Sequence, residues 1–297
     1  MKIFVTGASG YIGGSVAALL VKRGHQVRGL VRDAAKAEGV RAHGIEPVLG
    51  TLDDAALLEA EARAADAVIN GADSDHLGAV NALLAGLAGS GKRLIHTSGS
   101  SIVGDEAMGE PSERTYTEET PLKPEPDKVH RVALNERLLQ AAPGVHTVVL
   151  CNTLIYGDTL GPPAQSVQLP RLVREAKDSG VARYIGRGLN VWSNVHIADM
   201  AELYLLALEK APAGSFYYVE NGEAAFGDMR QAIARRLELG PARPLSAAEA
   251  VAKWGREMAV FGLGSNSRVR ADKARRELGW QPKRRSVIEW IEREMAR

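Results

Sequence analysis

Cysteine and long apolar runs are both scarce in this chain of 297 residues. The single cysteine, Cys151, excludes an internal disulfide and is typical of a protein in a reducing compartment. No apolar run approaches the roughly 20 residues that a membrane-spanning helix needs. The opening MKIFVTG has the pattern of a strand and a turn, not of a signal peptide. We therefore expect a cytoplasmic protein that does not enter a membrane.

An excess of charge is also missing, because 37 Lys and Arg residues face 36 Asp and Glu residues. A balanced chain has no global field that would attract nucleic acid or an anionic membrane, so we expect a small-molecule ligand. The seven histidines show no metal-ligand spacing with carboxylates or cysteine, and we expect no metal site. Only the last 30 residues are basic, and this segment is either a solvated helix face or a contact for an anionic ligand or partner.

The first half of the chain alternates short β-rich segments with helical patterns, which predicts βαβ units around a parallel sheet. Several of these strands are almost continuously apolar, as expected when helices cover both faces. The rhythm breaks after Cys151 into longer loops and a helix that we expect Asp199 to cap. The predicted strands are 2–6, 26–31, 46–49, 67–69, 93–97 and 147–151, and the helices between them are 15–23, 54–64, 77–88 and 129–141.

The turn FVTGASGYIGG places glycines three residues apart, directly after a strand and at the start of a helix. Glycine permits the tight turn, the close approach of a pyrophosphate and close helix–strand packing, and the helix N-terminus favours the diphosphate. The alternative is a strand–turn–helix that needs only flexibility. We predict a doubly wound, Rossmann-type α/β fold, with a dinucleotide-binding core at 1–151 and a smaller substrate lobe mainly at 152–297, from which about 190–210 returns to the core. The cofactor contacts predicted in the turn are Gly7, Ser9, Gly10, Tyr11, Ile12 and Gly13.

The second predicted strand ends in RGLVRD, where an NAD site usually offers a carboxylate and an NADP site a cation. Arg32 presents donors suited to a 2′-phosphate, while Asp33 falls one position late, so the sequence favours NADP, with NAD as the alternative. After the third strand, Asp53 accepts from the adenine amino group or caps the next helix. The further predicted cofactor contacts are Leu52, Gly71, Ala72 and Thr97.

Ten segments of the chain carry a resemblance to one known family. They are, in chain order, VTGASGYIGG, VRD, GTLDD, AVINGA, IHTSGSSIVGD, TEETPLKP, LIYGD, NVHIADMAELYLLALE, SFYYVENGE and ELGWQP. In these segments and in their order, the chain resembles the NAD-dependent epimerase/dehydratase family of the extended short-chain dehydrogenase/reductase superfamily. The resemblance covers nearly the whole chain. It implies a Rossmann core with a smaller C-terminal substrate lobe and hydride exchange at a carbinol carbon. It also implies a homodimer that associates through a four-helix bundle including 129–141.

The resemblance also predicts a catalytic tyrosine with a lysine four residues later, and this chain departs from that pattern. The tyrosine position falls on Lys128, the lysine position on Val132, and the position of the usual serine on Gly99. No tyrosine lies between Tyr116 and Tyr156, so a small shift in register does not restore the pair. The proton donor is therefore open.

Three kinds of mechanism fit these departures. In the first mechanism, another side chain donates the proton. The candidates are Lys128, which carries an amine at the tyrosine position, Ser98, which lies beside the missing hydroxyl, and Tyr156, which offers a phenol from another element. His130 is a weaker candidate, and each of the four is otherwise an ordinary surface or packing residue. Alternatively, solvent protonates an activated acceptor, or the protein only senses NADP(H). VWSN replaces the arginine common in nucleotide-sugar enzymes, which favours a less charged substrate. The predicted substrate contacts are Ser100, Asn152, Gln168, Trp192 and Asn194.

The sequence thus favours an NADPH-dependent oxidoreductase that reduces a small carbonyl compound with non-standard proton donation. A nucleotide-sugar epimerase or dehydratase is the alternative enzyme, and a non-catalytic NADP(H)-sensing regulator is the alternative without turnover.

Overall fold

The computed structural model describes residues 1–297, and its centre is one parallel sheet of seven strands in the order β10-β6-β5-β4-β1-β2-β3. The doubly wound Rossmann-type fold is therefore confirmed. The sequence predicted six strands for this sheet and a further strand at SFYYVE. The latter is the seventh strand, β10 (Ser215–Val219), which returns from the C-terminal half to pair in parallel with β6 at the sheet edge. The other strands are β1 (Lys2–Thr6), β2 (Gln26–Val31), β3 (Glu46–Leu49), β4 (Ala67–Asn70), β5 (Arg93–Gly99) and β6 (His146–Asn152).

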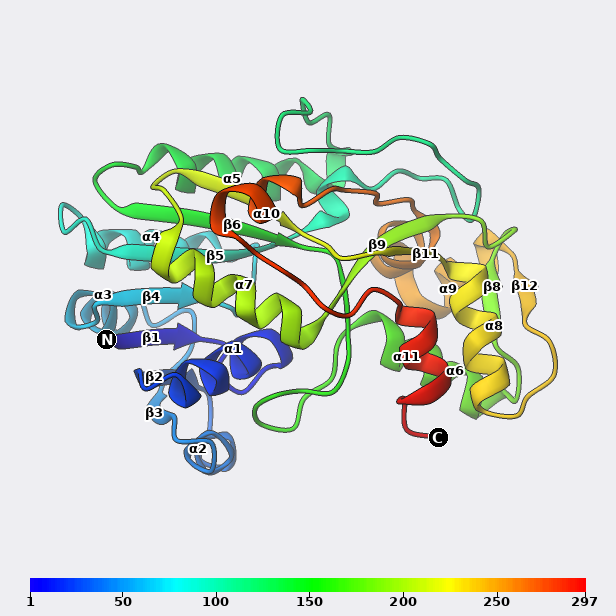
Figure 1. The fold of residues 1–297 in the computed structure, drawn as a ribbon, viewed down its shortest axis with the longest axis horizontal. Helices are drawn as coiled ribbons and strands as arrows, with labels where there is room; N and C mark the ends of the chain where they lie inside the picture. Colours follow the sequence, from blue (N-terminus) through cyan, green and yellow to red (C-terminus); the bar gives the residue numbers. More distant parts are fainter.

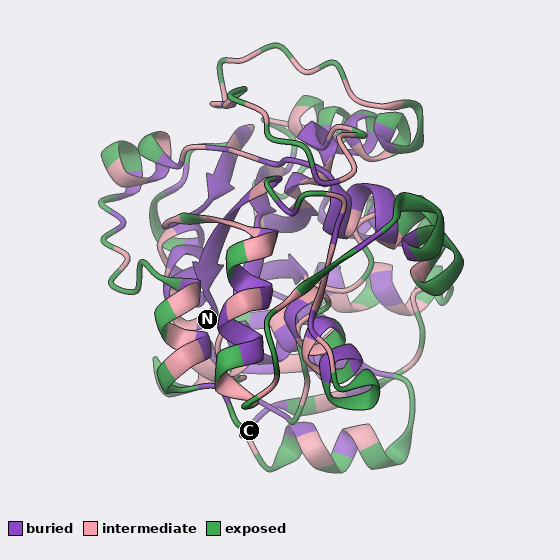
Figure 2. Ribbon diagram, turned by 90° about the vertical axis from the view of Figure 1, so that its right-hand side faces the viewer, coloured by how far each residue is buried: buried purple, intermediate pink, exposed green.

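Helices cover both faces of this sheet because its strands carry apolar side chains on both sides. One apolar core joins the sheet to α1 (Tyr11–Lys22), α2 (Ala34–Arg41), α7 (Ile197–Lys210) and α10 (Asp272–Leu278). A second core, on the other face, joins it to α3 (Ala55–Ala64), α4 (Leu77–Leu87) and α5 (Val129–Gln140). Figure 1 shows α1 and α7 in front of the strands, and Figure 2 shows the central strands as buried.

The chain reverses its direction of winding between β1 and β4, which are neighbours in the sheet although β2 and β3 lie between them in sequence. At such a switch point the loops after the two strands diverge and leave a crevice at the carboxyl edge. The glycine-rich turn follows β1 and the Gly71–Ala72 pair follows β4. Both predicted cofactor segments therefore meet at this crevice.

A smaller group of elements lies beyond the carboxyl edge of the sheet, at the right of Figure 1. It contains a three-stranded sheet, a two-stranded sheet and a third apolar core of its own. A π-helical segment, η3 (Glu257–Gly264), also belongs to this core. The strands are β7 (Leu154–Tyr156), β8 (Arg183–Ile185), β9 (Val191–His196), β11 (Glu223–Ala225) and β12 (Arg243–Leu245), and the helices are α6 (Gln168–Ser179), α8 (Phe226–Arg236), α9 (Ala247–Arg256) and α11 (Val287–Arg293).

Two local predictions need correction. The helix α1 begins at Tyr11, four residues before the predicted start, because Gly10 already has the extended backbone of an N-cap residue. The cap of α7 is His196, whose Nδ1 accepts from the backbone N–H of Ala198, whereas the predicted cap Asp199 lies inside the first turn and accepts from the N–H of Arg284. None of the helices combines the length and the apolar character required to span a membrane.

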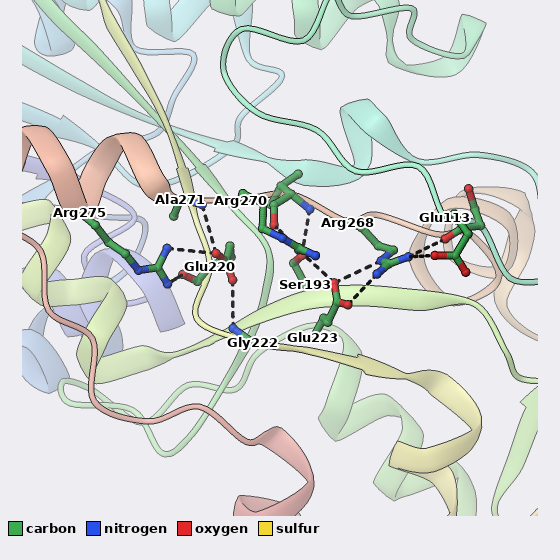
Figure 3. A network of polar contacts seen from close by, with 11 residues as sticks. Glu113, Ser193, Glu220, Gly222, Glu223, Arg268, Arg270, Ala271 and Arg275 are labelled. Carbon is green, nitrogen blue, oxygen red and sulfur yellow. Dashed lines mark hydrogen bonds and ion pairs between the residues drawn. The ribbon is translucent and has the colours of Figure 1, made fainter.

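The basic C-terminal segment is held by ion pairs within the protein (Figure 3). Arg268 and Arg270 both contact the carboxylate of Glu223, at 2.8 and 3.0 Å. Arg275, on α10, pairs with Glu220 at 3.1 Å. These arginines fasten the segment to the end of β10 and to β11, so this part of the segment is neither a purely solvated face nor a free anion-binding surface.

Candidate functional site

The glycine-rich turn after β1 is closely packed against the end of β4. Gly7 has φ +69°, and a Cβ atom on it would lie 2.8 Å from the carbonyl oxygen of Gly71, so a side chain fits neither the backbone conformation nor the space. Gly13 likewise faces the carbonyl group of Gly7, which allows α1 to pack onto the turn. The first turn of α1 has no acidic residue and no side-chain cap. This helix N-terminus therefore suits a diphosphate.

A cavity of about 550 Å³ opens from this turn along the carboxyl edge of the sheet. Its walls consist mainly of glycine, hydroxyl and apolar residues, and Arg131 and Glu257 are its only charged side chains. Twelve of the residues predicted from the sequence line it: seven of the twelve proposed cofactor contacts, four of the five substrate contacts and the catalytic candidate Ser98. They are Gly7, Gly10, Tyr11, Ile12, Gly71, Ala72, Thr97, Ser98, Ser100, Asn152, Gln168 and Trp192.

The predicted adenosine-binding residues lie outside this cavity, on the open edge beyond β2 and β3. Arg32 is exposed at the end of β2. The carboxylate of Asp33 accepts from the N–H of Lys36 at 2.8 Å and caps α2, so it is already engaged. Asp53 is exposed and contacts the ring of His76 at 3.1 Å, while Asp54 stands at the N-cap position of α3 that Asp53 was proposed to fill. Leu52 is half-buried and Ser9 lies in the turn.

The floor of the cavity carries an unused acceptor. Asn152 is 4% exposed, its Nδ2 donates to the hydroxyl of Tyr204 at 2.8 Å, and its Oδ1 has no partner. The same hydroxyl lies 2.8 Å from Oγ1 of Thr97, and burial raises the pKa of Tyr204 to about 12, so the phenol stays neutral. Because Thr97 is the only other partner of this fully buried phenol, we infer that the proton of Tyr204 points to Thr97. Thr97 then has a proton to donate and Asn152 an oxygen to accept, which together fit an amide group such as the carboxamide of nicotinamide.

The serines at the end of β5 and directly after it differ in how many of their hydrogen bonds are already made. The Oγ of Ser98 accepts from Nδ2 of Asn135, on α5, at 2.9 Å, and its hydroxyl also lies beside the buried thiol of Cys151. Ser100 is almost completely buried and is in hydrogen-bond contact with Ser267. Of the two, Ser98 keeps more capacity for a ligand.

Arg131 is the charged group of the cavity that the sequence did not single out. It lies on α5 and makes a two-pronged ion pair with Asp75, with Nε 2.7 Å from Oδ1. Its Nη1 donates to Oγ of Ser101 at 2.9 Å. The neighbouring His130 is mostly exposed and contacts the same carboxylate at 3.2 Å. The signal in the sequence was weak, because Arg131 is one residue away from the position of the family lysine and its partner is 56 residues away.

Lys128 is buried, yet its ammonium does not line the cavity. The Nζ atom pairs with Glu257 and lies 4.7 Å from the centre of the Phe261 ring. Glu257 and Phe261 belong to η3 and do line the cavity. Lys128 therefore contacts the wall that the C-terminal half contributes, and not the space where a ligand would lie.

Tyr156 and Asn194 are placed away from the cavity. The hydroxyl of Tyr156 donates to the main-chain oxygen of Arg284 at 3.2 Å, burial raises its pKa, and the ring packs edge-on against His196. Asn194 is buried on β9, and its side-chain amide has no partner. Neither residue lines the first cavity, and Tyr156 instead lines a neighbouring second cavity. Tyr11 is the only tyrosine in the lining, and its hydroxyl donates to the oxygen of Gly157 at 2.7 Å.

The outer wall of the cavity comes from the C-terminal half. Nε2 of Gln168 donates to the carbonyl oxygen of Gly262 at 2.6 Å, and Nε1 of Trp192 donates to the carbonyl oxygen of Ser265 at 3.0 Å. Both side chains thereby hold the segment around η3 in place, so Trp192 is fixed by packing. Met258 and Phe261 complete an apolar side that shields the cavity from water.

A second cavity, of about 680 Å³, lies next to the first and shares Tyr11, Gln165 and Ser166 with it. Its lining includes Arg174 and Lys177 as well as Asp158 and Asp178. The charges are balanced, so this cavity has no excess of positive charge.

Comparison with known proteins gives a consistent result. The model of the NAD dependent epimerase/dehydratase family matches residues 3–219. An oxidase from Acremonium sp is 33% identical, covering 95% of this chain and 92% of its own length. The 4-hydroxy-2-methyl-3-oxo-4-farnesyl-3,4-dihydroquinoline-1-oxide ketoreductase of Stigmatella aurantiaca is 30% identical, with 94% and 92% covered. The structure of dTDP-glucose 4,6-dehydratase from Bacillus anthracis in complex with NAD has a TM-score of 0.78 at 19% identity, with 99% of this chain and 97% of that chain covered.

Proposed function

The chain belongs to the NAD-dependent epimerase/dehydratase family, and from this premise we propose that it is an oxidoreductase that binds NADP(H) and reduces a small carbonyl compound. The observation that carries this proposal is the cavity at the switch point. It begins at the glycine-rich turn, and only two of the side chains that line it, Arg131 and Glu257, are charged. The oxidase and the ketoreductase among the relatives support oxidoreductase chemistry.

The residues present fit a nicotinamide dinucleotide. The N-terminus of α1 and the turn around Gly10 would hold the diphosphate, because a side chain at Gly7 or Gly13 would close the space. Asn152 and Thr97 would hold the carboxamide, since they offer one acceptor and one donor. When bound in its reduced form, the nicotinamide supplies a hydride to the carbonyl carbon and is itself oxidised, while water supplies the proton for the oxygen.

The preference for NADP(H) rests on two neighbouring residues. Asp33, the carboxylate that could bind a ribose 2′-hydroxyl, is used as the cap of α2. Arg32 is exposed beside it, with a guanidinium group suited to a 2′-phosphate. A cation without a competing carboxylate favours the phosphorylated cofactor.

Solvent protonation is the version of the mechanism that the geometry favours. The hydroxyl of Tyr11 is committed to a main-chain carbonyl group, and Tyr156 and Lys128 lie outside the lining. The hydroxyl of Ser98 is too weak an acid to act without a base. An activated carbonyl compound, whose reduction leaves a delocalised anion, needs no side-chain acid.

The alternative of a nucleotide-sugar epimerase or dehydratase is favoured by the structural neighbour, which is a dTDP-glucose dehydratase. Such a substrate carries a diphosphate with two negative charges, and the cavity offers one cation, Arg131, whose charge is balanced by Asp75. Arg187 pairs with Glu110, and Arg268 with Glu223, so neither is free to replace the missing cation. An uncharged substrate fits this lining better.

Cofactor titration followed by a carbonyl screen tests the proposal. NADPH should bind more tightly than NADH, and Arg32→Ala should weaken NADPH binding by about tenfold or more, because a charge-assisted hydrogen bond contributes about 1.5–3 kcal/mol. NADH binding should not change. Arg41→Ala, at the other end of α2, is the matched control. Equal affinity of the wild type for both cofactors would contradict the NADP preference, and tight NADPH binding without oxidation across activated ketones and quinones would favour the sensor.

A further inference from the structure

At the end of β5, Gly99 has no side chain and the guanidinium group of Arg131 lies close to it. Residue 99 is a glycine, and a Cβ atom built on it would have a single neighbour within 4 Å, Nη1 of Arg131, at 3.4 Å. The guanidinium group of Arg131 therefore lies within van der Waals distance of the point from which a serine side chain would start. Arg131 lines the wall of the cavity together with Ser98 and Ser101.

The guanidinium group of Arg131 makes three hydrogen bonds to two residues, and these do not use all of its N–H donors. Asp75, in the loop after β4, binds Nε and Nη2, and Ser101, after β5, accepts from Nη1. These contacts use three of the five N–H donors of an arginine side chain. Two donors remain, and the side chain is 15% exposed. The group is thus held in place and mostly shielded from bulk water, and its two remaining donors are left for a ligand in the cavity that it lines.

The charge of this group is fixed. Burial raises the pKa of Asp75, but the hydrogen bonds and the charge of Arg131, with His130, lower it more, so the carboxylate stays ionised. The ion pair with Asp75 outweighs burial and raises the pKa of Arg131. Arg131 therefore cannot deliver a proton at neutral pH, and what it can offer is a positive charge with fixed N–H donors.

We propose that Arg131 binds the reacting oxygen of the substrate and stabilises the negative charge that this oxygen gains, in the place where a serine hydroxyl would otherwise act. The inference rests on the proposed reductase function. Preorganised donors of this kind act on charge as it develops and cost no reorganisation, which is why they contribute strongly in a site shielded from water. The inference also explains how a site without a phenol acid can reduce a carbonyl group: the oxygen is held as an anion until water protonates it.

The first test measures binding alone. Benzoate serves as a probe, because its carboxylate carries the negative oxygen that Arg131 should recognise. Calorimetry of the NADP⁺-loaded protein should show benzoate binding that Arg131→Met abolishes. The control, Arg137→Met, removes an exposed arginine of the same helix α5 that contacts Asn81 and should bind benzoate like the wild type. Benzoate binding that is equal in Arg131→Met and the wild type would overturn the inference.

The second test measures turnover with NADPH and 9,10-phenanthrenequinone. Arg131→Met should lower kcat by about 100-fold, the usual effect of removing one such donor, with little change in the KM for NADPH. Added guanidinium chloride should restore part of the rate in Arg131→Met, which a merely structural role would not allow. A kcat within twofold of the wild type would refute the proposal.

The two proposals can fail separately. A wild type that oxidises no NADPH with any carbonyl compound refutes the reductase function, and the benzoate measurement then decides the role of Arg131 by itself. Turnover by the wild type with an unaffected Arg131→Met variant refutes only the inference. Arg131→Lys keeps the charge and loses the two-pronged contact with Asp75. If Arg131→Met does not fold, this variant should show weaker benzoate binding and a kcat at least about tenfold below that of the wild type, and wild-type values would overturn the inference.

Discussion

The arginine buried in the C-terminal half gives the sharpest prediction for stability. Arg230, on α8, is fully buried, donates to the main-chain oxygens of Leu172 and Arg183, and pairs with Glu175. Replacement by methionine keeps an unbranched apolar stem but leaves two buried carbonyl groups without their donor. Each such loss costs about 1–3 kcal/mol, and breaking one side of a buried ion pair costs about 3–5 kcal/mol.

Glu175 moderates this cost, because Arg183 at 3.0 Å and Lys253 at 3.2 Å still neutralise it in the variant. We therefore expect Arg230→Met to lower the free energy of unfolding by about 3–5 kcal/mol: about 1–2 kcal/mol for each carbonyl group that loses a donor, and about 1 kcal/mol for the pair with Glu175. Arg235→Met, on the same helix, removes an exposed pair with Glu292 and should cost less than about 1 kcal/mol.

Urea unfolding followed by tryptophan fluorescence measures both variants. Trp192, Trp254 and Trp290 all lie in or against the apolar core of the C-terminal half, so the signal reports on the region that Arg230 supports. Equal losses in Arg230→Met and Arg235→Met would refute the reasoning, because they would mean that burial adds nothing to the contribution of the arginine.

Two further predictions concern Glu175 and Lys128. Burial raises the pKa of Glu175, but its cationic partners lower it more, so the pKa lies below the ordinary value of 4.5. The stability that this carboxylate contributes is therefore fully present above about pH 4.5 and is lost as the pH falls through the lowered pKa. When unfolding is measured at decreasing pH, Glu175→Gln should lose less stability than the wild type. Lys128→Met should leave the shape of the pH profile of kcat unchanged, because Lys128 does not line the cavity and its ammonium is paired with Glu257. A profile that loses one limb in this variant would instead assign Lys128 to proton transfer.

The sequence predicted the parts of this protein that depend on local pattern. The glycine spacing after β1 identifies the turn because each glycine meets backbone within a few residues or at the neighbouring strand. The alternating strands and helices likewise determine the sheet, apart from the place of β10, whose residues pair with residues of β6 that lie 67 positions earlier in the chain.

The parts of the site that depend on distant partners could not be predicted in this way. The role of Arg131 becomes visible only when α5 brings it to Asp75 and to the bare backbone of Gly99. The outer wall at η3 joins the cavity from the far C-terminal half, in a segment whose sequence has no family motif. Tyr156 and Asn194 were proposed from their places in such motifs, yet their side chains point elsewhere.

The unusual residues around the cavity depend on one another. Val132, at the position where the family resemblance places a lysine, is 8% exposed and packs in an apolar cluster with Ile102 and Tyr218. A lysine there would bury an ammonium group in that cluster, one residue away from the charge of Arg131, and such a group is stable only with a partner. A tyrosine at residue 128 would also give up the contact of Lys128 with Glu257. Exchanging these two residues for the family pair would therefore not restore the family mechanism, since Gly99, Arg131 and Val132 form one alternative arrangement in which charge, and not a phenol, meets the substrate oxygen.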